Sequence, residues 1–166
     1  MTIRRASYDE AKAIKGWDEF VGDRRIDNWR GEMFVAEESG EVVAYITYSS
    51  NLFYNRPFIS LLCVKPSHRR RGIGRLLVKQ VLAAYTGLEV WVSTEEWNEA
   101  AVALFQSMKF KKMGAIKGLN RDESTEAYFV HREEAEPSSP GDVATAPPQR
   151  PGVRQEMNDD QKSELR

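Results

Sequence analysis

Apolar residues recur along residues 1–132 at two spacings, one typical of strands and the other typical of helices. Short apolar runs predict seven strands, at residues 2–5, 33–36, 42–48, 58–64, 88–93, 109–117 and 125–131. Spacing of about 3.6 residues predicts helices at residues 7–20, 72–85 and 98–108, with a short further helix at 27–33. This order predicts a mixed α/β (α+β) fold, in which a central sheet of six to seven strands is flanked by about four helices.

Local patterns add detail to this arrangement. Ser7 followed by Glu10 is the pattern of a capping box at the start of the first helix. Residues 38–41 (ESGE) are typical of a hairpin turn. The run at 58–64 (FISLLCV) is apolar at nearly every position, which predicts a central strand buried on both faces. The helix that follows should bury one stripe of side chains, formed by Ile73, Leu76, Leu77, Val81 and Ala84.

The chain changes character at residue 133. Residues 133–166 hold five of the seven prolines and no aromatic residue, so they cannot bury enough apolar surface to offset the entropy of ordering. We therefore predict one folded domain, residues 1–132, followed by a disordered, Pro-rich acidic tail, residues 133–166. A solvated tail without function and a regulatory or partner-binding tail are both open interpretations.

Charge and cysteine content narrow the classes of protein. Residues 1–132 carry 20 Lys/Arg and 17 Asp/Glu, whereas the tail carries four and eight. This mildly basic domain suits an anionic small ligand, and we expect no nucleic-acid partner. The single cysteine, Cys63, suits a reducing cytoplasm, and two histidines give no basis for a metal site. No apolar run is long enough to span a membrane, so we expect no membrane partner.

A loop rich in glycine and arginine joins the apolar strand to the next helix. Its sequence from residue 64 to residue 77 is VKPSHRRRGIGRLL. Backbone N–H groups at the start of a helix have no intrahelical partner, and the helix dipole adds positive charge there. Gly72 and Gly74 have no Cβ, so a phosphate can approach the backbone closely. Full charges and planar donors are supplied by Arg69, Arg70, Arg71 and Arg75.

The spacing of this loop identifies a phosphate site of a particular kind. Neither the P-loop pattern nor the dinucleotide pattern G-x-G-x-x-G is present. The observed spacing is Arg69-x-x-Gly72-x-Gly74. It resembles the signature of the GNAT acyltransferase superfamily, [Q/R]-x-x-G-x-[G/A], which lies between the fourth strand and the following helix.

A second region extends the resemblance. Residues 91–110 (WVSTEEWNEAAVALFQSMKF) are similar to the GNAT segment in which an asparagine opens a helix that ends in Tyr/Phe-x-x-x-Gly-Phe. Asn98, Phe105 and Phe110 take those places, and Lys109 stands where glycine is usual. The ending KGLNRDESTEAYFVHR also resembles small bacterial GNAT proteins, so the similarity covers roughly residues 1–132.

The resemblance implies an N-acetyltransferase that uses acetyl-CoA as co-substrate and no metal, with the amine attacking the thioester directly in a ternary complex. The backbone of Leu62 and Val64 would bind the pantetheine arm, and the Leu62 N–H would stabilise the oxyanion as it forms. Asn98 and Phe105 would flank the pantetheine near the thiol. The pyrophosphate would lie on Arg69, Arg70, Arg71, Gly72, Ile73 and Gly74. The motif does not separate acetyl from longer acyl groups.

Three positions where the family often places a catalytic acid or base hold other residues. The base positions on the fourth and fifth strands are Phe58 and Ser93, and the position of the acidic tyrosine is Phe105. An α-amine is about a quarter to a third neutral near pH 7.5, whereas a lysine amine is about 0.1% neutral, so an α-amine is the easier acceptor. A water chain that delivers the proton to Glu95, Glu96 or bulk solvent is the alternative.

The acceptor is the least defined part of the prediction. Trp29, in the early helical region, and Tyr54 and Asn55, before the fourth strand, are candidates for the wall of an acceptor pocket for a small-molecule or peptide amine. Two competing functions stay open. One is a CoA-binding regulatory module that transfers nothing, and the other is an enzyme acting on a protein N-terminus, a lysine or a charged tRNA. The sequence does not decide the oligomeric state, and a homodimer is one alternative.

Overall fold

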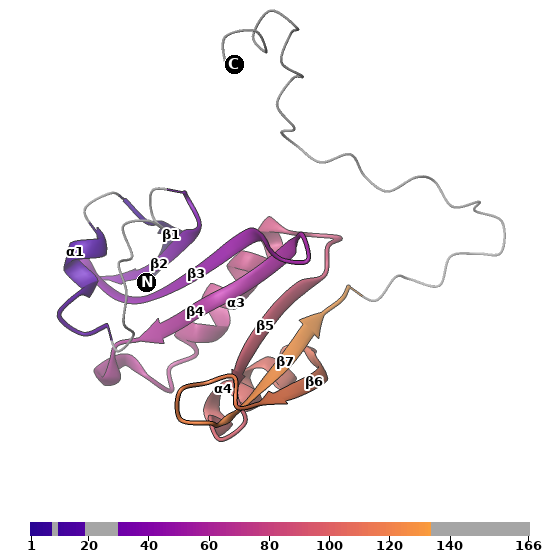
Figure 1. Cartoon of the computed structure of the whole chain (residues 1–166). Coiled ribbons are helices and arrows are strands. Elements are labelled where there is room, and N and C mark those ends of the chain that lie inside the picture. Colours follow the sequence, from indigo (N-terminus) through magenta and orange to yellow (C-terminus); the bar gives the residue numbers. More distant parts are fainter. Residues whose placement is uncertain (8–9, 19–29, 134–166) are drawn as a thin grey trace, which may run out of the picture. The chain divides into compact units, whose positions relative to one another are not determined.

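The structure, a computed structural model, describes residues 1–7, 10–18 and 30–133. The predicted tail therefore lies outside the described residues, except for Glu133, whose carboxylate accepts the Gly87 N–H at 3.0 Å. The described elements, in chain order, are β1 (Thr2–Arg5), α1 (Glu10–Ile14), β2 (Met33–Glu38), β3 (Glu41–Phe53), β4 (Arg56–Val64), a 3₁₀ turn (Pro66–His68), α3 (Ile73–Ala84), β5 (Val90–Glu95), α4 (Glu99–Ser107), β6 (Lys111–Lys117) and β7 (Thr125–His131) (Figure 1).

The strands of the described residues form one mixed sheet in the order β1-β2-β3-β4-β5-β7-β6. Strands β4 and β5 are parallel because α3 connects them as a crossover, and all other neighbours are antiparallel. The predicted fold class is confirmed. Where about four helices were predicted, the described residues contain three α-helices and one 3₁₀ turn.

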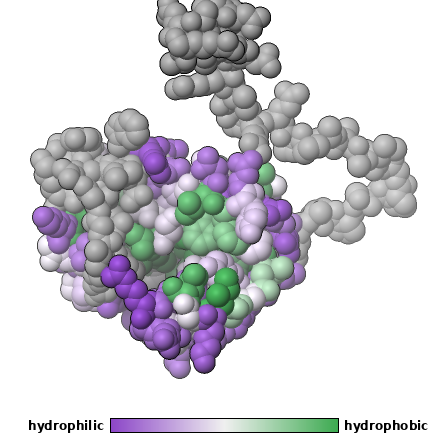
Figure 2. Space-filling view, viewed as in Figure 1, coloured by the Kyte–Doolittle hydropathy of each residue, from purple (hydrophilic) through white to green (hydrophobic). Residues whose placement is uncertain are grey.

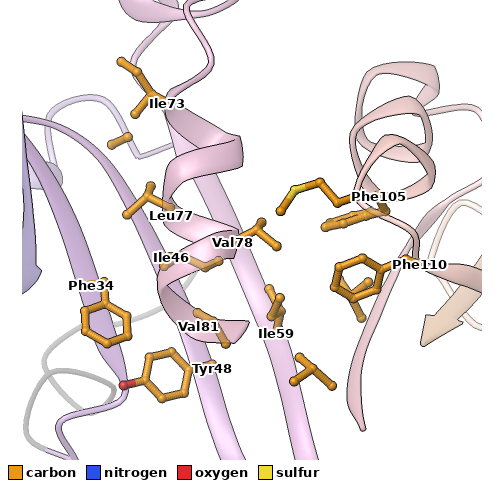
Figure 3. Packing of buried hydrophobic residues seen from close by; sticks show 14 of the residues in the cluster. Phe34, Ile46, Tyr48, Ile59, Ile73, Leu77, Val78, Val81, Phe105 and Phe110 are labelled. Atoms are coloured by element: carbon orange, nitrogen blue, oxygen red, sulfur yellow. The ribbon is translucent and has the colours of Figure 1, made fainter. Parts of the chain in front are cut away.

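Hydrophobic residues pack on both faces of the sheet. The larger cluster lies between the sheet and the helices α3 and α4, and Figure 3 shows Leu77, Val78 and Val81 of α3 beside Ile46 and Ile59 of the sheet. The smaller cluster lies on the opposite face and includes Ile14 of α1 with Met33, Val35, Val42, Tyr45 and Cys63. We call this second side of the sheet the α1 face. Cys63 is thus a core residue, as its place in an apolar strand predicted.

The N-terminal helices differ from the prediction. Helix α1 ends at Ile14, although the apolar pattern predicted a helix over 7–20, of which residues 8, 9, 19 and 20 lie outside the described part. Gly16 lies two residues later, and glycine is a poor helix former, so the chain closes with a turn in which Trp17 N–H donates to Ile14 C=O at 3.0 Å. The capping pattern is present, since the Glu10 carboxylate accepts the Ser7 backbone N–H. In the predicted helix at 27–33, residues 27–29 lie outside the described part, and Met33 begins β2 instead.

Burial along β4 and α3 also corrects the prediction. Strand β4 is central, but it is not buried on both faces, because Ser60 is exposed and Leu62 and Val64 are half-buried. On α3, Leu76 is 40% exposed and Ala84 is exposed, whereas Val78 is buried. The buried stripe of α3 therefore consists of Ile73, Leu77, Val78 and Val81.

The remaining predicted bounds differ by a few residues. The hairpin turn at 38–41 is confirmed, with Ser39 and Gly40 at φ 53° and 80°. Strand β3 continues to Phe53, five residues beyond the predicted end. Its polar residues 49–51 hid this extension, in which Ser49 pairs with Phe58 and Phe53 pairs with Arg56 of β4. Strand β5 begins at Val90, two residues later than predicted.

Candidate acetyl-transfer site

The two parallel strands at the centre of the sheet separate. Strand β4 pairs with β5 only at Phe58–Trp91 and Ile59–Val92, although β4 continues to Val64 and β5 to Glu95. A register shift between β3 and β4 leaves Ser60 as an extra residue just where the pairing ends. Figure 1 shows the two strands moving apart toward their C-terminal ends. Beyond Ile59, one edge of β4 therefore has no neighbouring strand among the described residues.

Register decides which β4 backbone groups face that edge. Lys65 donates its N–H to Val43 C=O at 2.8 Å, which makes this a hydrogen-bonded position between β3 and β4. Hydrogen-bonded and non-hydrogen-bonded pairs alternate in an antiparallel ladder, so Leu62 and Val64 direct their N–H and C=O groups away from β3. The Val64 C=O accepts the Arg69 Nε–H at 3.0 Å, in agreement with this direction. The Leu62 N–H thus points toward the side from which β5 has departed.

The loop after β4 brings bare backbone next to this edge. Gly72 is the N-cap of α3 and has φ 79°, a left-handed conformation that favours glycine. The N–H groups that follow it open the helix and have no intrahelical acceptor. A Cβ on Gly74 would lie 3.4 Å from Leu62 Cδ2 and 3.5 Å from Leu104 Cδ2. A Cβ here would make ordinary van der Waals contacts with β4 and α4, so only a longer side chain would press on them.

The cations around this loop have different partners. Arg71 donates two hydrogen bonds to the Glu38 carboxylate, at 2.7 and 3.0 Å, and His68 Nε2 lies 3.4 Å from the same carboxylate. The Arg71 hydrogen bond lowers the pKa of Glu38, and the carboxylate in turn raises the pKa of Arg71. Arg75 donates to Ser107 Oγ at 2.7 Å, and Arg70 is exposed with φ 63°. The predicted pyrophosphate ligands are therefore together in one loop, but Arg71 is turned toward Glu38.

Residues of α4 face the same region from the other helix. Asn98 is the N-cap of α4, and its Oδ1 accepts the Ala101 N–H at 3.2 Å. Phe105 is 3% exposed and packs against Phe110 and Phe129, with ring centroids 5.4 and 6.3 Å apart. Asn98 thus has a structural role as a cap, and Phe105 belongs to the core.

The two parallel strands thus separate next to a glycine-rich helix start. The sequence model of the acetyltransferase (GNAT) family matches residues 2–110. The chain belongs to the GNAT acetyltransferase family. It is therefore an N-acetyltransferase, with acetyl-CoA as its co-substrate and an amine as its acceptor.

Individual relatives agree with this assignment. The chain is 28% identical over 141 residues to N-alpha-acetyltransferase RimI of Mycobacterium tuberculosis, a match that covers 81% of this chain and 89% of the relative. It is 32% identical over 91 residues to human N-alpha-acetyltransferase 30, covering 51% of this chain and 25% of that protein. Among solved structures, a GNAT acetyltransferase from Bacillus cereus superposes with a TM-score of 0.72 at 24% identity, covering 81% and 98% of the two chains. The ribosomal-protein-S18-alanine N-acetyltransferase of Escherichia coli superposes with a TM-score of 0.68 at 18% identity, covering 83% and 98%.

In the part of the chain that the structure describes, no helix is both long enough and apolar enough to cross a membrane. The described His, Cys, Asp and Glu side chains do not assemble into a group of three or more that is suited to a metal ion.

The two positions at which the family often places a base, Phe58 and Ser93, lie on β4 and β5. Phe58 and Ser93 project from β4 and β5 onto the α1 face, because the neighbouring Ile59 and Val92 are buried toward α3 and α4. Of the two weak base candidates, Glu96 forms an ion pair with Lys112. Glu95 lies on the α1 face and is the cross-strand partner of Glu126 on β7.

Two polar residues on β7 were missed by the sequence analysis. Tyr128 is the cross-strand partner of Ser93, so the two side chains lie about 5 Å apart at Cβ on the α1 face. Burial, and then the charge of Glu126, raise the pKa of Tyr128. Glu126 accepts a hydrogen bond from Asn120 Nδ2 at 3.0 Å. Alternation along residues 125–131 shows that these side chains share a face, but only the register shows which β5 residues they meet.

Two of the three predicted acceptor-wall residues lie in one turn. Tyr54 and Asn55 form the two-residue turn between β3 and β4, at φ 49° and 63°, and Tyr54 is 83% exposed. This turn precedes β4, whereas the glycine loop follows it, so the two are about 25 Å apart along the strand. Trp29 lies outside the described residues.

Proposed function

We propose that this enzyme transfers the acetyl group of acetyl-CoA to the α-amine of a peptide or protein N-terminus, by direct attack within a ternary complex. One observation carries the proposal. The backbone of Leu62 and Val64 is directed to the edge that β5 leaves open, next to the bare N-terminus of α3. A thioester along that edge would be reachable from both faces of the sheet.

The donor half of the reaction rests on backbone groups. The diphosphate would lie on the first N–H groups of α3 and on the loop arginines, because an anion is favoured at a helix N-terminus. The pantetheine arm would extend along Leu62 and Val64 as an added strand, with the thiol end near Asn98 and Phe105. The Leu62 N–H would then donate to the thioester oxygen, where negative charge develops during attack.

The acceptor half favours an α-amine. The positions 58, 93 and 105 carry phenylalanine, serine and phenylalanine, so none offers a carboxylate or a tyrosine hydroxyl. An α-amine needs little help because a substantial fraction is neutral at pH 7.5, whereas a lysine amine needs a strong base. The proton would pass through water to Glu95, to Glu126 or to bulk solvent. The similarity to N-alpha-acetyltransferase RimI supports the same acceptor class.

Turnover with matched peptides tests this function. Release of free CoA thiol would be followed with peptides that have a free N-terminus, with the same peptides blocked at the N-terminus but containing lysine, and with small polyamines. We expect turnover with the free α-amine and at least about a hundredfold less with blocked lysine peptides, in line with their neutral fractions. Preferred turnover of lysine or polyamine would contradict the proposed acceptor, and no calorimetric heat with any CoA thioester would contradict the donor.

A further inference from the structure

Four aromatic rings from four strands meet on the α1 face. Phe53 is their hub, with ring centroids 5.0 Å from Trp91, 5.4 Å from Phe58 and 5.7 Å from Tyr128. Phe53 lies at the end of β3, after an irregularity in the β3–β4 ladder between Ser49 and Phe53, and its ring contacts Trp91 of β5 and Tyr128 of β7. We call Phe53, Phe58, Trp91 and Tyr128 the aromatic cluster. All four are half-buried, so each ring keeps some exposed surface.

The aromatic cluster adjoins the point of acetyl transfer. Phe58 and Trp91 are one of the two pairs that still join β4 and β5, so their rings lie directly below the point where the strands separate. Ser93 is the next residue of β5 on the same face, and its cross-strand partner is Tyr128 of the cluster. On this face α1 covers β2, β3 and β4 through the smaller core cluster, and no helix of the described residues packs on β5 or β7 there. Figure 2 shows hydrophobic residues in the hollowed middle of one face of the molecule, with hydrophilic residues along the rim.

The charges along this face are ordered. Before the cluster, Glu89 is paired with both Arg56 at 3.0 Å and Arg132 at 2.6 Å, so these three groups together carry a net positive charge. After it, Glu95 and Glu126 are direct cross-strand partners, and like charges in that arrangement repel one another. A cation between them would relieve the repulsion. The face therefore presents an apolar surface, then the transfer point, then negative charge.

That order fits one kind of ligand, which is a chain end with a positive charge and a large apolar side chain close to it. We infer that the aromatic cluster binds a large apolar side chain from the first two residues of the acceptor peptide, while the α-ammonium group approaches from the side of Glu95 and Glu126. This inference rests on the proposed function and adds the specificity. The rings exclude water from the apolar side chain, and the carboxylates attract the protonated amine before it loses its proton.

Peptides that differ only in the first two residues provide the test. Free-N-terminus peptides with leucine or phenylalanine there would be compared with peptides carrying serine or alanine, at saturating acetyl-CoA. We expect wild-type kcat/KM to be at least about tenfold higher for the apolar peptides, since burial of such a side chain discriminates by about that factor or more. In Phe53→Ala, the preference should fall to less than about threefold, through a higher KM for the apolar peptides.

Two further variants make the result specific. Phe53→Leu keeps an apolar side chain and should retain part of the preference, even if Phe53→Ala fails to fold. Leu52→Ala removes an adjacent side chain that is 65% exposed and should leave the preference unchanged. Affinity for acetyl-CoA, measured by calorimetry, should be the same in all these variants because the change lies on the acceptor side.

The outcomes separate the inference from the function on which it rests. If wild type acetylates peptides of both kinds equally, the aromatic cluster does not select the acceptor, although the proposed function survives. If Leu52→Ala and Phe53→Ala change the preference equally, the effect is not specific to the cluster and the inference is wrong. If peptides are not acetylated while the enzyme binds acetyl-CoA and acts on another amine, both the proposed function and the inference are overturned.

Discussion

The proposed donor side and the proposed acceptor side of this acetyltransferase are built from different chemical groups. The proposed donor side, around the end of β4 and the start of α3, presents backbone N–H groups and two glycines. The proposed acceptor side, on the α1 face of β4, β5 and β7, presents side chains that three separate segments bring together. Backbone sites depend on local spacing, so they tolerate sequence change around them. Side-chain sites depend on register, so they can diverge between relatives of the same fold.

The largest expected effect of a single change is on the donor side. Gly74→Glu places a side chain against Leu62 and Leu104, and it adds negative charge where the diphosphate should lie. We expect acetyl-CoA to bind about a hundredfold more weakly or worse, which corresponds to about 2.7 kcal/mol. Calorimetric titration measures this directly. The control is Gly114→Glu, because a Cβ at Gly114 of β6 meets nothing within 4 Å. Equal affinity of the two variants would show that the diphosphate lies elsewhere.

One substitution on the proposed acceptor side should raise the rate of acetyl transfer. Ser93→Glu restores a carboxylate at a position where the family often has a base, on the α1 face beside Tyr128. We expect the rate with an α-amine peptide at pH 6.5 to rise by about tenfold, and the rising limb of the pH profile to move to lower pH, because a base would then take the proton. Ser93→Gln introduces a side chain of similar size to glutamate but without its charge, so neither the faster rate nor the shifted pH profile is expected. An unchanged profile in Ser93→Glu would mean that deprotonation already has an efficient route.

The same contrast explains what could be predicted from the sequence. The element order, the glycine loop and the cap at Asn98 follow from local spacing, and the fold and family predictions were confirmed. The pair of Arg71 with Glu38 joins residues 33 positions apart, and no local pattern marks it. The position of Phe53 over Trp91 depends on an irregular hairpin, which apolar alternation does not reveal. The early end of α1, at Ile14, was not predicted because the apolar pattern continues past Gly16.

A smaller effect separates two roles of Asn98. As the N-cap of α4, Asn98 accepts the Ala101 N–H, and its loss in Asn98→Ala should lower the free energy of unfolding by about 1 kcal/mol. Asn98→Asp keeps the capping oxygen and should retain stability, as measured by denaturant unfolding. Asn98→Asp loses the amide nitrogen but also gains a negative charge that repels the anionic CoA, so Asn98→Ser, an uncharged capping residue, is measured beside it. Weaker acetyl-CoA binding by both variants would assign a donor hydrogen bond to CoA, whereas unchanged binding by Asn98→Ser would leave Asn98 with the cap alone.

The smallest expected effect concerns Glu38, and it tests whether the donor side depends on backbone more than on side-chain charge. Glu38→Gln removes the charge that holds Arg71, so Arg71 becomes available to the diphosphate. We expect acetyl-CoA affinity to rise by less than about threefold, since exposed ion pairs are weak. The Arg71 hydrogen bond lowers the pKa of Glu38. In wild type the ion pair is therefore fully formed at any pH above the usual glutamate pKa, and it is lost only as the pH falls through the lowered pKa. Titration of Glu38 itself should accordingly add no step to the affinity difference between wild type and Glu38→Gln from pH 6 to pH 8. A tenfold or larger gain would show that side-chain charge, held in check by Glu38, limits CoA binding more than the helix N-terminus does.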